Sequence, residues 1–183
     1  LNAKEESTQY LVKLFNKLNL NKCRIVDDEG TDLVFSFLKG SQFHSSFIET
    51  ISKRVFCPTI TSSDIYRLLD PTTLTGWLNI SKPIVLWGKV IRNLSLRFNG
   101  GKIVEYSSSP QGEALMDLYL KQDPLSGRAS MITLSEISSP LFDEDIVLIP
   151  EYDRMRTISI TIGGPKGEAV EEKNIEHTVD SLL

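Results

Sequence analysis

The stretch MITLSEI, residues 131–137, decides how the rest of this sequence is interpreted. Its alternating pattern predicts a β-strand, in which every second side chain lies on the same face. Ile132, Leu134 and Glu136 therefore share one face. A carboxylate at the end of an apolar row either reaches water where the strand ends, or is buried and then paired, protonated or bound to a metal. The strand alone leaves both interpretations of Glu136 open.

The composition is that of an ordinary globular chain. The 183 residues are 40% hydrophobic and 24% charged, with a formal net charge of −4. We expect a single domain over residues 1–183, as a whole protein or as a trimmed piece of a longer two-domain protein. No basic cluster interleaved with aromatic residues indicates nucleic-acid binding. No apolar run is long enough to cross a membrane, so no membrane partner is expected.

The cysteine content favours a reducing compartment. Cys23 and Cys57 have no disulfide-framework or zinc-site spacing around them, and each lies beside apolar residues. We predict that both are small buried core residues. Two unpaired cysteines of this kind are typical of a cytoplasmic protein.

Two helices are predicted. The first covers residues 4–19, and the second begins at the N-cap Ser109 and Pro110 and runs to about residue 122. The apolar stripe expected to face the core is Tyr10, Leu11, Leu14, Phe15 and Leu18 in the first helix, and Ala114, Leu115, Leu118 and Tyr119 in the second.

Most other patterned segments predict strands joined by short turns. Residues 23–26 and 31–38 form one hairpin, with Leu33, Phe35 and Phe37 on one face, and residues 94–98 and 102–106 form another around Asn99-Gly100. Further strands are expected at 54–57, 74–80 and 156–162, the last with Ile158, Ile160 and Ile162 inward. Residues 64–69 fit a strand or a short turn, and residues 40–53 a surface loop or short helix that exposes His44. Turns this short favour antiparallel pairing, so the predicted class is α+β.

No segment carries a strong catalytic motif by itself. The chain has no phosphate-binding glycine-rich loop that opens a helix, no nucleophile elbow and no His-Glu-x-x-His pattern. Two histidines can serve at most one small site. The order of elements is therefore more informative than any single motif.

That order resembles the C-terminal half of the thermophilic metallo-aminopeptidases of the aminopeptidase T and aminopeptidase S type, to which dihydroxypyridine dioxygenase-like proteins are related. Gly30-Thr31-Asp32-Leu33 opens a strand, Gly76 lies in a later strand, and an Asn-Gly hairpin and a helix lead to Ser135-Glu136. The resemblance covers roughly residues 5–180. It implies the predicted α+β fold, a homodimer, and a dinuclear metal site that hydrolyses peptides with a metal-activated water.

The resemblance also implies a reduced set of metal ligands. Glu136 stands in the second Gly-Glu segment, and Asp64 stands where the first glutamate is expected. Ser159 replaces a metal-binding histidine in a Gly-Thr-x-His strand. His177 and Asp180 lie where a closing His-x-Asp is expected, with Asp180 one residue late. Asp64, Glu136, His177 and Asp180 suit one zinc, manganese or magnesium ion, or none, while two ions are not expected without the strand histidine.

Three functional hypotheses follow. The first is a metal-dependent aminopeptidase or other hydrolase. The second, which the reduced ligand set favours, is a weakly active or non-catalytic relative that acts as an interaction domain and binds a peptide or small molecule. The third is one half of a split or truncated enzyme whose other half supplies the missing groups.

Overall fold

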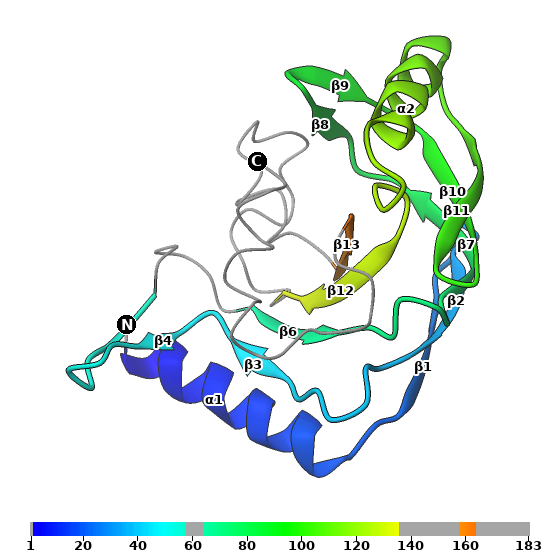
Figure 1. Ribbon diagram of the computed structural model, residues 1–183. Coiled ribbons are helices and arrows are strands. Elements are labelled where there is room, and N and C mark those ends of the chain that lie inside the picture. Colours follow the sequence, from blue (N-terminus) through cyan, green and yellow to red (C-terminus); the bar gives the residue numbers. More distant parts are fainter. Residues whose placement is uncertain (1, 58–63, 136–157, 164–183) are drawn as a thin grey trace.

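The computed structural model describes residues 2–57, 64–135 and 158–163 of the chain, shown in Figure 1. Two helices and thirteen strands lie within these residues, which confirms the α+β prediction. The bounds are α1 Asn2–Lys17, β1 Lys22–Val26, β2 Asp32–Ser36, β3 His44–Ser45, β4 Ile48–Glu49, β5 Val55–Phe56, β6 Ile65–Leu68, β7 Thr75–Ile80, β8 Ile84–Leu86, β9 Lys89–Ile91, β10 Leu94–Asn99, β11 Lys102–Ser107, α2 Pro110–Gln122, β12 Ala129–Leu134 and β13 Ile158–Ile162.

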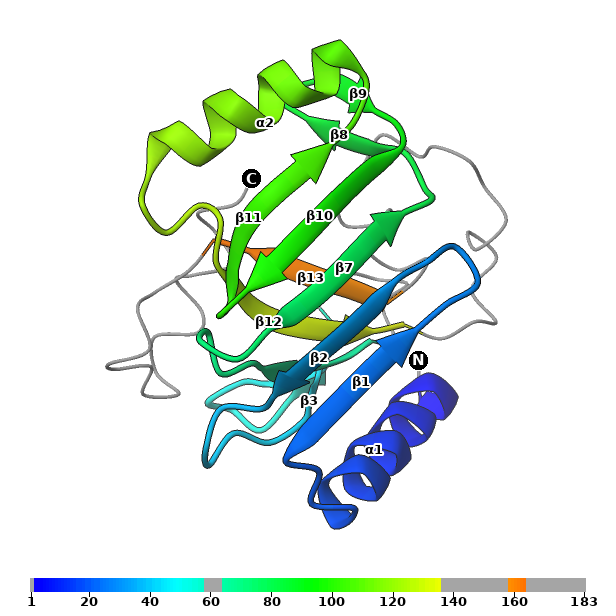
Figure 2. The same ribbon diagram turned by 90° about the vertical axis from the view of Figure 1, so that its right-hand side faces the viewer.

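The larger sheet has five antiparallel strands in the order β1-β2-β7-β10-β11. It is built from the two predicted hairpins, β1–β2 and β10–β11, with β7 inserted between them (Figure 2). Leu33, Phe35 and Phe37 are buried on one face of the first hairpin, as their alternation predicts. The five strands therefore form a continuous sheet with one apolar face, which is turned toward the core.

The smaller sheet has the order β13-β12-β6-β3, and its pairs are also antiparallel. Its central strand β12 confirms the predicted strand over residues 131–134, and residues 64–69 form a strand rather than a turn. Ile160 and Ile162 of β13 pack against the core as predicted, whereas Ile158 is 48% exposed at the start of this edge strand. Glu136 lies outside the described residues.

The hydrophobic core lies between the inner faces of the two sheets. Strands β2 and β10 supply one side of it, and β6 and β12 supply the other. The buried hydrophobic residues of this cluster are Leu33, Phe35, Phe37, Phe43, Ile65, Leu69, Leu74, Ile91, Leu94, Leu96, Phe98, Met116, Ala129 and Ile132. Burial of this apolar surface is the main source of stability for such a fold.

Helix α1 presents a different face to the core than its apolar stripe predicts. Leu11 and Phe15 pack inward, but Tyr10, Leu14 and Leu18 are 64%, 39% and 56% exposed. The Asn16 side chain exchanges two hydrogen bonds with the backbone of Phe43, at 3.0 and 2.7 Å. These bonds fix the rotation of the helix, and hydropathy patterning does not detect them because Asn is polar.

Helix α2 begins as predicted, since the Ser109 hydroxyl accepts a hydrogen bond from Gly112 N and caps the first turn. Its buried residues are Gly112 and Met116. Of the predicted stripe, Leu115 and Tyr119 pack against the core, whereas Ala114 and Leu118 are exposed. A Cβ at Gly112 would lie 2.3 Å from Ser108 Oγ and 3.0 Å from Ile91 Cγ2. The missing side chain therefore lets this turn approach strand β9 closely, which sets the inward face.

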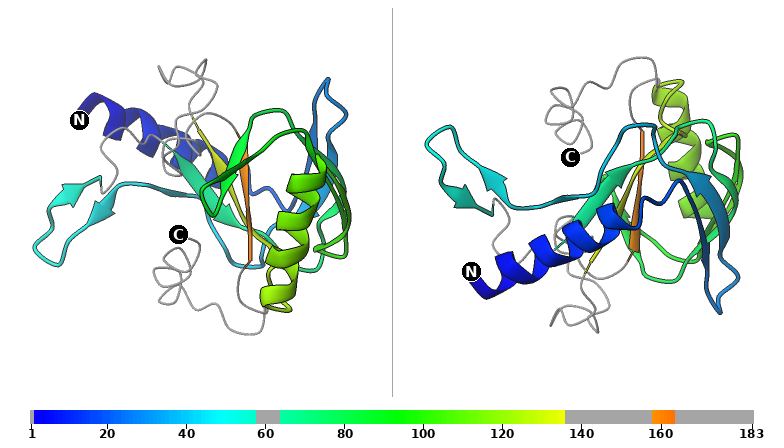
Figure 3. Two further views of the ribbon diagram at one scale, coloured as in Figure 1. Left: turned by 90° about the horizontal axis from the view of Figure 1, so that it is seen from above. Right: turned by 90° about the horizontal axis from the view of Figure 1, so that it is seen from below.

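Residues 40–53 contain strands, not the predicted loop or short helix. Here β3 joins the edge of the smaller sheet, and β4 pairs with β5 in a separate hairpin that projects from the body of the molecule (Figure 3). Strands of two residues are too short to leave a periodic pattern.

The two cysteine side chains are partly exposed. Cys23 and Cys57 are half-buried and form no disulfide. Cys23 packs against the core as predicted, but neither side chain is completely buried. Within the described residues, neither helix is long and apolar enough to cross a membrane.

Candidate functional site

Three strand ends meet at one end of the smaller sheet. Leu134, the last residue of β12, pairs with Ile65 at the start of β6 and with Ile158 at the start of β13. The next residues outward are Asp64 before β6 and Ser135 after β12. The antiparallel register thus gathers segments that are far apart in the sequence, which is the usual way in which a sheet assembles a site.

Asp64 is a buried carboxyl group at this sheet end, only 2% exposed. Its backbone oxygen accepts hydrogen bonds from Ser46 N and Ser46 Oγ, at 3.2 and 3.3 Å, which ties it to the strand β3 side of the sheet. Asp64 also takes part in a further interaction. Since a buried carboxylate needs compensation by hydrogen bonds, charge or metal, Asp64 is the described residue with the chemistry of a ligand here.

Ser159 is half-buried in β13 and pairs directly with Thr133 of β12. A neutral hydroxyl is a much weaker ligand for zinc than imidazole or carboxylate. Ser159, where the family resemblance implies a histidine, therefore carries a side chain with little affinity for a metal.

One row of side chains crosses the whole smaller sheet. His44, Tyr66, Thr133 and Ser159 are consecutive register partners, and directly opposed residues have their side chains on one face. The His44 and Tyr66 rings stack with centroids 5.9 Å apart. The predicted exposed loop position of His44 is thus wrong. Three strand spacings of about 4.8 Å put His44 roughly 14 Å from Ser159, too far to replace a ligand there.

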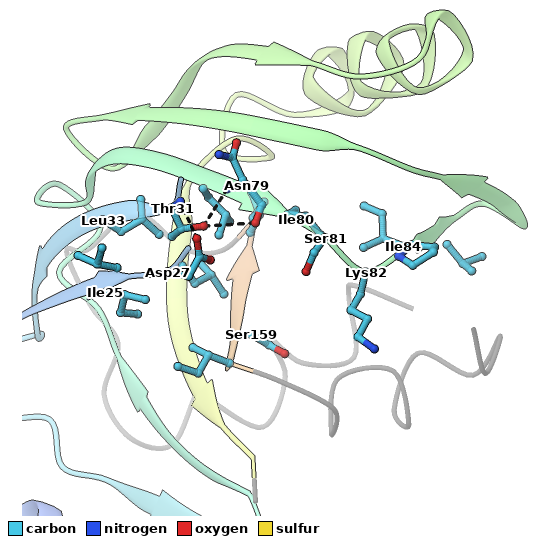
Figure 4. Close-up of a pocket in the computed structure, with 17 residues that line it drawn as sticks. Ile25, Asp27, Thr31, Leu33, Asn79, Ile80, Ser81, Lys82, Ile84 and Ser159 are labelled. Carbon is cyan, nitrogen blue, oxygen red and sulfur yellow. Dashed lines mark hydrogen bonds between the residues drawn. The ribbon is translucent and has the colours of Figure 1, made fainter. Parts of the chain in front are cut away.

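A cavity of about 490 Å³ lies between β13 and one end of the five-stranded sheet (Figure 4). Its walls come from the β1–β2 turn, the end of β7, the segment that leads into β8, and β13. The residues that line it are Ile25, Val26, Asp27, Thr31, Leu33, Leu78, Asn79, Ile80, Ser81, Lys82, Pro83, Ile84, Val85, Ile158, Ser159, Ile160 and Ile162.

One wall of the cavity is fixed by hydrogen bonds. Asp27 Oδ1 accepts from the backbone N–H groups of Glu29 and Thr31, at 2.9 and 2.8 Å. Asn79 N donates to the Thr31 hydroxyl at 3.1 Å, and the Asn79 amide donates to Glu29 O at 2.8 Å. These contacts join the β1–β2 turn to the end of β7, so the cavity has a preformed polar rim.

The family model described as "Thermophilic metalloprotease (M29)" matches residues 2–178. The chain belongs to the thermophilic metalloprotease family.

Individual members of this and related groups share the fold. Aminopeptidase T from Thermus aquaticus is 23% identical over 143 residues, which are 78% of this chain and 35% of that protein. The structure of wild-type AmpT from Thermus thermophilus superposes with a TM-score of 0.80 at 19% identity, over 92% of this chain and 43% of that one. A 2,5-dihydroxypyridine dioxygenase from Pseudomonas putida KT2440 has a TM-score of 0.54 at 16% identity, over 71% of this chain and 39% of that one. The chain thus spans about two fifths of the length of these relatives.

Of the four proposed metal ligands, the structure describes only Asp64. Glu136, His177 and Asp180 lie outside the described residues. Within the residues that the structure describes, no three His, Cys, Asp or Glu side chains gather closely enough to hold a metal ion. Asp64 and Ser159 alone do not fit a dinuclear centre, because they supply one carboxylate and one neutral hydroxyl.

The Asp27 turn gives a testable pH dependence. Burial is the largest single influence and raises the pKa of Asp27, but the hydrogen bonds from Thr31, Glu29 and Gly30 together outweigh it, so the net shift is downward. A lowered folded-state pKa stabilises the fold above the unfolded value of about 3.9, and this contribution is lost as the pH falls through the folded-state pKa. Asp27→Asn should therefore lower the Tm by about 2 °C at neutral pH and by less near pH ~3. Thermal melts across this range measure the effect.

Asp28→Asn is the matched control for that experiment. Asp28 is an exposed neighbour that accepts none of the hydrogen bonds of the Asp27 turn. The Tm of the Asp28→Asn variant should equal that of the unmodified protein at every pH. A Tm difference for Asp27→Asn that stays constant down to pH ~3 would contradict the assigned role of the carboxylate.

Proposed function

We propose that this member of the thermophilic metalloprotease family does not catalyse peptide hydrolysis efficiently and acts by binding a peptide or small molecule. Ser159 is the observation that carries the proposal. It occupies a paired strand position, directly opposite Thr133, at which the family resemblance implies a metal-binding histidine. Without an imidazole there, the second ion of a dinuclear centre loses a strong ligand.

Asp64, which directly precedes β6 on the other side of β12, adds support. An aspartate in place of the expected glutamate has a side chain one methylene shorter, so its carboxylate reaches less far from the sheet. A difference of about 1 Å in the position of a catalytic group is enough to reduce the rate a hundredfold. The fold is retained without these groups because packing in the core does not depend on them.

A metal-dependent hydrolase is the second candidate function. The burial of Asp64 favours it, because a 2%-exposed carboxyl group is costly unless it is compensated, and a cation is one form of compensation. In that case Glu136, His177 and Asp180 would join Asp64 around one zinc, manganese or magnesium ion. When bound, such an ion polarises a carbonyl and lowers the pKa of water.

A peptidase assay separates the two functions. The purified chain is incubated with trileucine in the presence of zinc, manganese or magnesium, and free leucine is measured, with Thermus aquaticus aminopeptidase T as the positive control. We expect no release above the buffer rate. Metal-dependent release by the purified chain that disappears in Asp64→Asn, while circular dichroism shows an intact fold, would overturn the proposal in favour of the hydrolase.

A further inference from the structure

The cavity between β13 and the five-stranded sheet has an aliphatic interior. Most of the residues that line it have branched aliphatic side chains, and these include Ile25, Leu78, Ile84 and Ile160. None of the described residues that line it is aromatic. Such a surface favours a flexible aliphatic ligand, because a planar aromatic ligand would find no ring against which to stack. Its volume of about 490 Å³ lies in the range of small-molecule sites.

Among the described residues that line the cavity, Asp27 and Lys82 are charged, and they differ in what they can offer a ligand. The Asp27 carboxylate already accepts hydrogen bonds from two backbone N–H groups and serves to hold the β1–β2 turn. Lys82 lies in the segment between β7 and β8, across the cavity from Asp27 and Thr31 in Figure 4. Lys82 is half-buried and takes part in an interaction of its own. An ammonium group has three donors, so it can serve more than one acceptor.

We infer that this cavity binds an aliphatic carboxylate, with the hydrocarbon chain against the Ile25, Ile84 and Ile160 side chains and the carboxylate on the Lys82 ammonium. The inference rests on the proposed function, since it names the class of small molecule that the domain binds. The charge on Lys82 selects an anion over a neutral alcohol of equal length. The hydrogen-bonded Asp27 turn gives the cavity a rigid rim, which lowers the entropic cost of binding.

Isothermal titration with decanoate and with decanol tests the inference. Decanoate should bind, and Lys82→Met should weaken its binding by about tenfold to a hundredfold, the effect of one charge-assisted hydrogen bond. Lys82→Arg keeps the charge and should restore binding to within about threefold of the unmodified protein. Decanol should bind the Lys82→Met variant and the unmodified protein equally. Lys89→Met is the matched control, because Lys89 is an exposed lysine on the neighbouring strand β9 and does not line the cavity.

The results that would contradict the carboxylate site differ from the results that would contradict the proposed function. No heat of binding for decanoate, or equal weakening by Lys82→Met and Lys89→Met, would overturn the carboxylate site. Circular dichroism of each variant shows whether a loss of binding comes from unfolding. If Lys82→Met does not fold, the binding of decanoate by Lys82→Arg decides the test. Release of leucine from trileucine by a protein that binds decanoate would overturn the proposed function alone. An inert protein that does not bind decanoate would overturn the ligand class alone.

Discussion

Replacing Gly76 by alanine is expected to destabilise the protein by about 4 kcal/mol, or to prevent folding altogether. Gly76 lies in β7, the central strand of the five-stranded sheet, with a φ of +122°. An added Cβ would lie 1.9 Å from Asp32 O and 3.2 Å from Leu33 Cα. The backbone of β2 cannot move away without breaking its pairing with β7, so the clash adds to the cost of the unfavourable φ. Urea unfolding monitored by circular dichroism measures the change.

Gly40→Ala is the matched control for this substitution. Gly40 also has a positive φ, +82°, but nothing lies within 4 Å of an added Cβ. Gly40→Ala should therefore destabilise the protein only by the cost of the positive φ, roughly 1–2 kcal/mol. Equal destabilisation by the two substitutions would show that the close approach of β7 and β2 is not what requires glycine at Gly76.

Replacing Arg67 by alanine is expected to destabilise the protein by about 3 kcal/mol. Arg67 is only 7% exposed, and its burial lowers the pKa of the guanidinium from its ordinary value. Its Nη1 donates to Leu20 O at 2.9 Å and its Nε donates to Ser41 Oγ at 3.1 Å. Its Cζ lies 4.2 Å from the centroid of the Phe37 ring. Alanine would leave a cavity at this ring and a buried carbonyl without its donor.

Arg97→Ala is the control for Arg67→Ala, because Arg97 pairs with Glu105 at 3.1 Å on the exposed face of the larger sheet. The side chains of this pair are 52% and 56% exposed, so solvent screens it and its loss should cost less than about 1 kcal/mol. Thermal or urea unfolding of both variants gives the comparison. Equal losses would contradict the assigned role of Arg67, which connects β6 to Leu20, Ser41 and the Phe37 ring.

The sheet could be predicted from the sequence wherever a local signal was strong. The alternation of Leu33, Phe35 and Phe37 and the Asn99-Gly100 turn each specify a hairpin through neighbouring residues. The rotation of α1 and α2 could not be predicted in this way. It depends on the Asn16 bonds to Phe43 and on the close approach at Gly112, which are contacts with residues distant in the sequence.

The candidate site could be predicted only in part, for a related reason. The resemblance singles out Asp64 and Ser159 from the sequence, but the burial of Asp64 and the pairing of Ser159 with Thr133 are seen only in the structure. Strand β3 has only two residues, so the sequence pattern around His44 predicts a loop, and the stacking of His44 on Tyr66 leaves no trace in that pattern. The aliphatic cavity is formed by side chains from four separated segments, and no local motif marks it. The roles of Glu136, His177 and Asp180 stay predictions.

The number of metal ions bound per chain tests the central claim most directly. The protein is purified without added metal, equilibrated with excess zinc, desalted and examined by elemental analysis, with Asp64→Asn in parallel. Because Ser159 stands in place of an imidazole, we predict fewer than two zinc ions per chain. Two zinc ions per chain, reduced by Asp64→Asn, would contradict the claim that this family member lacks a complete dinuclear centre.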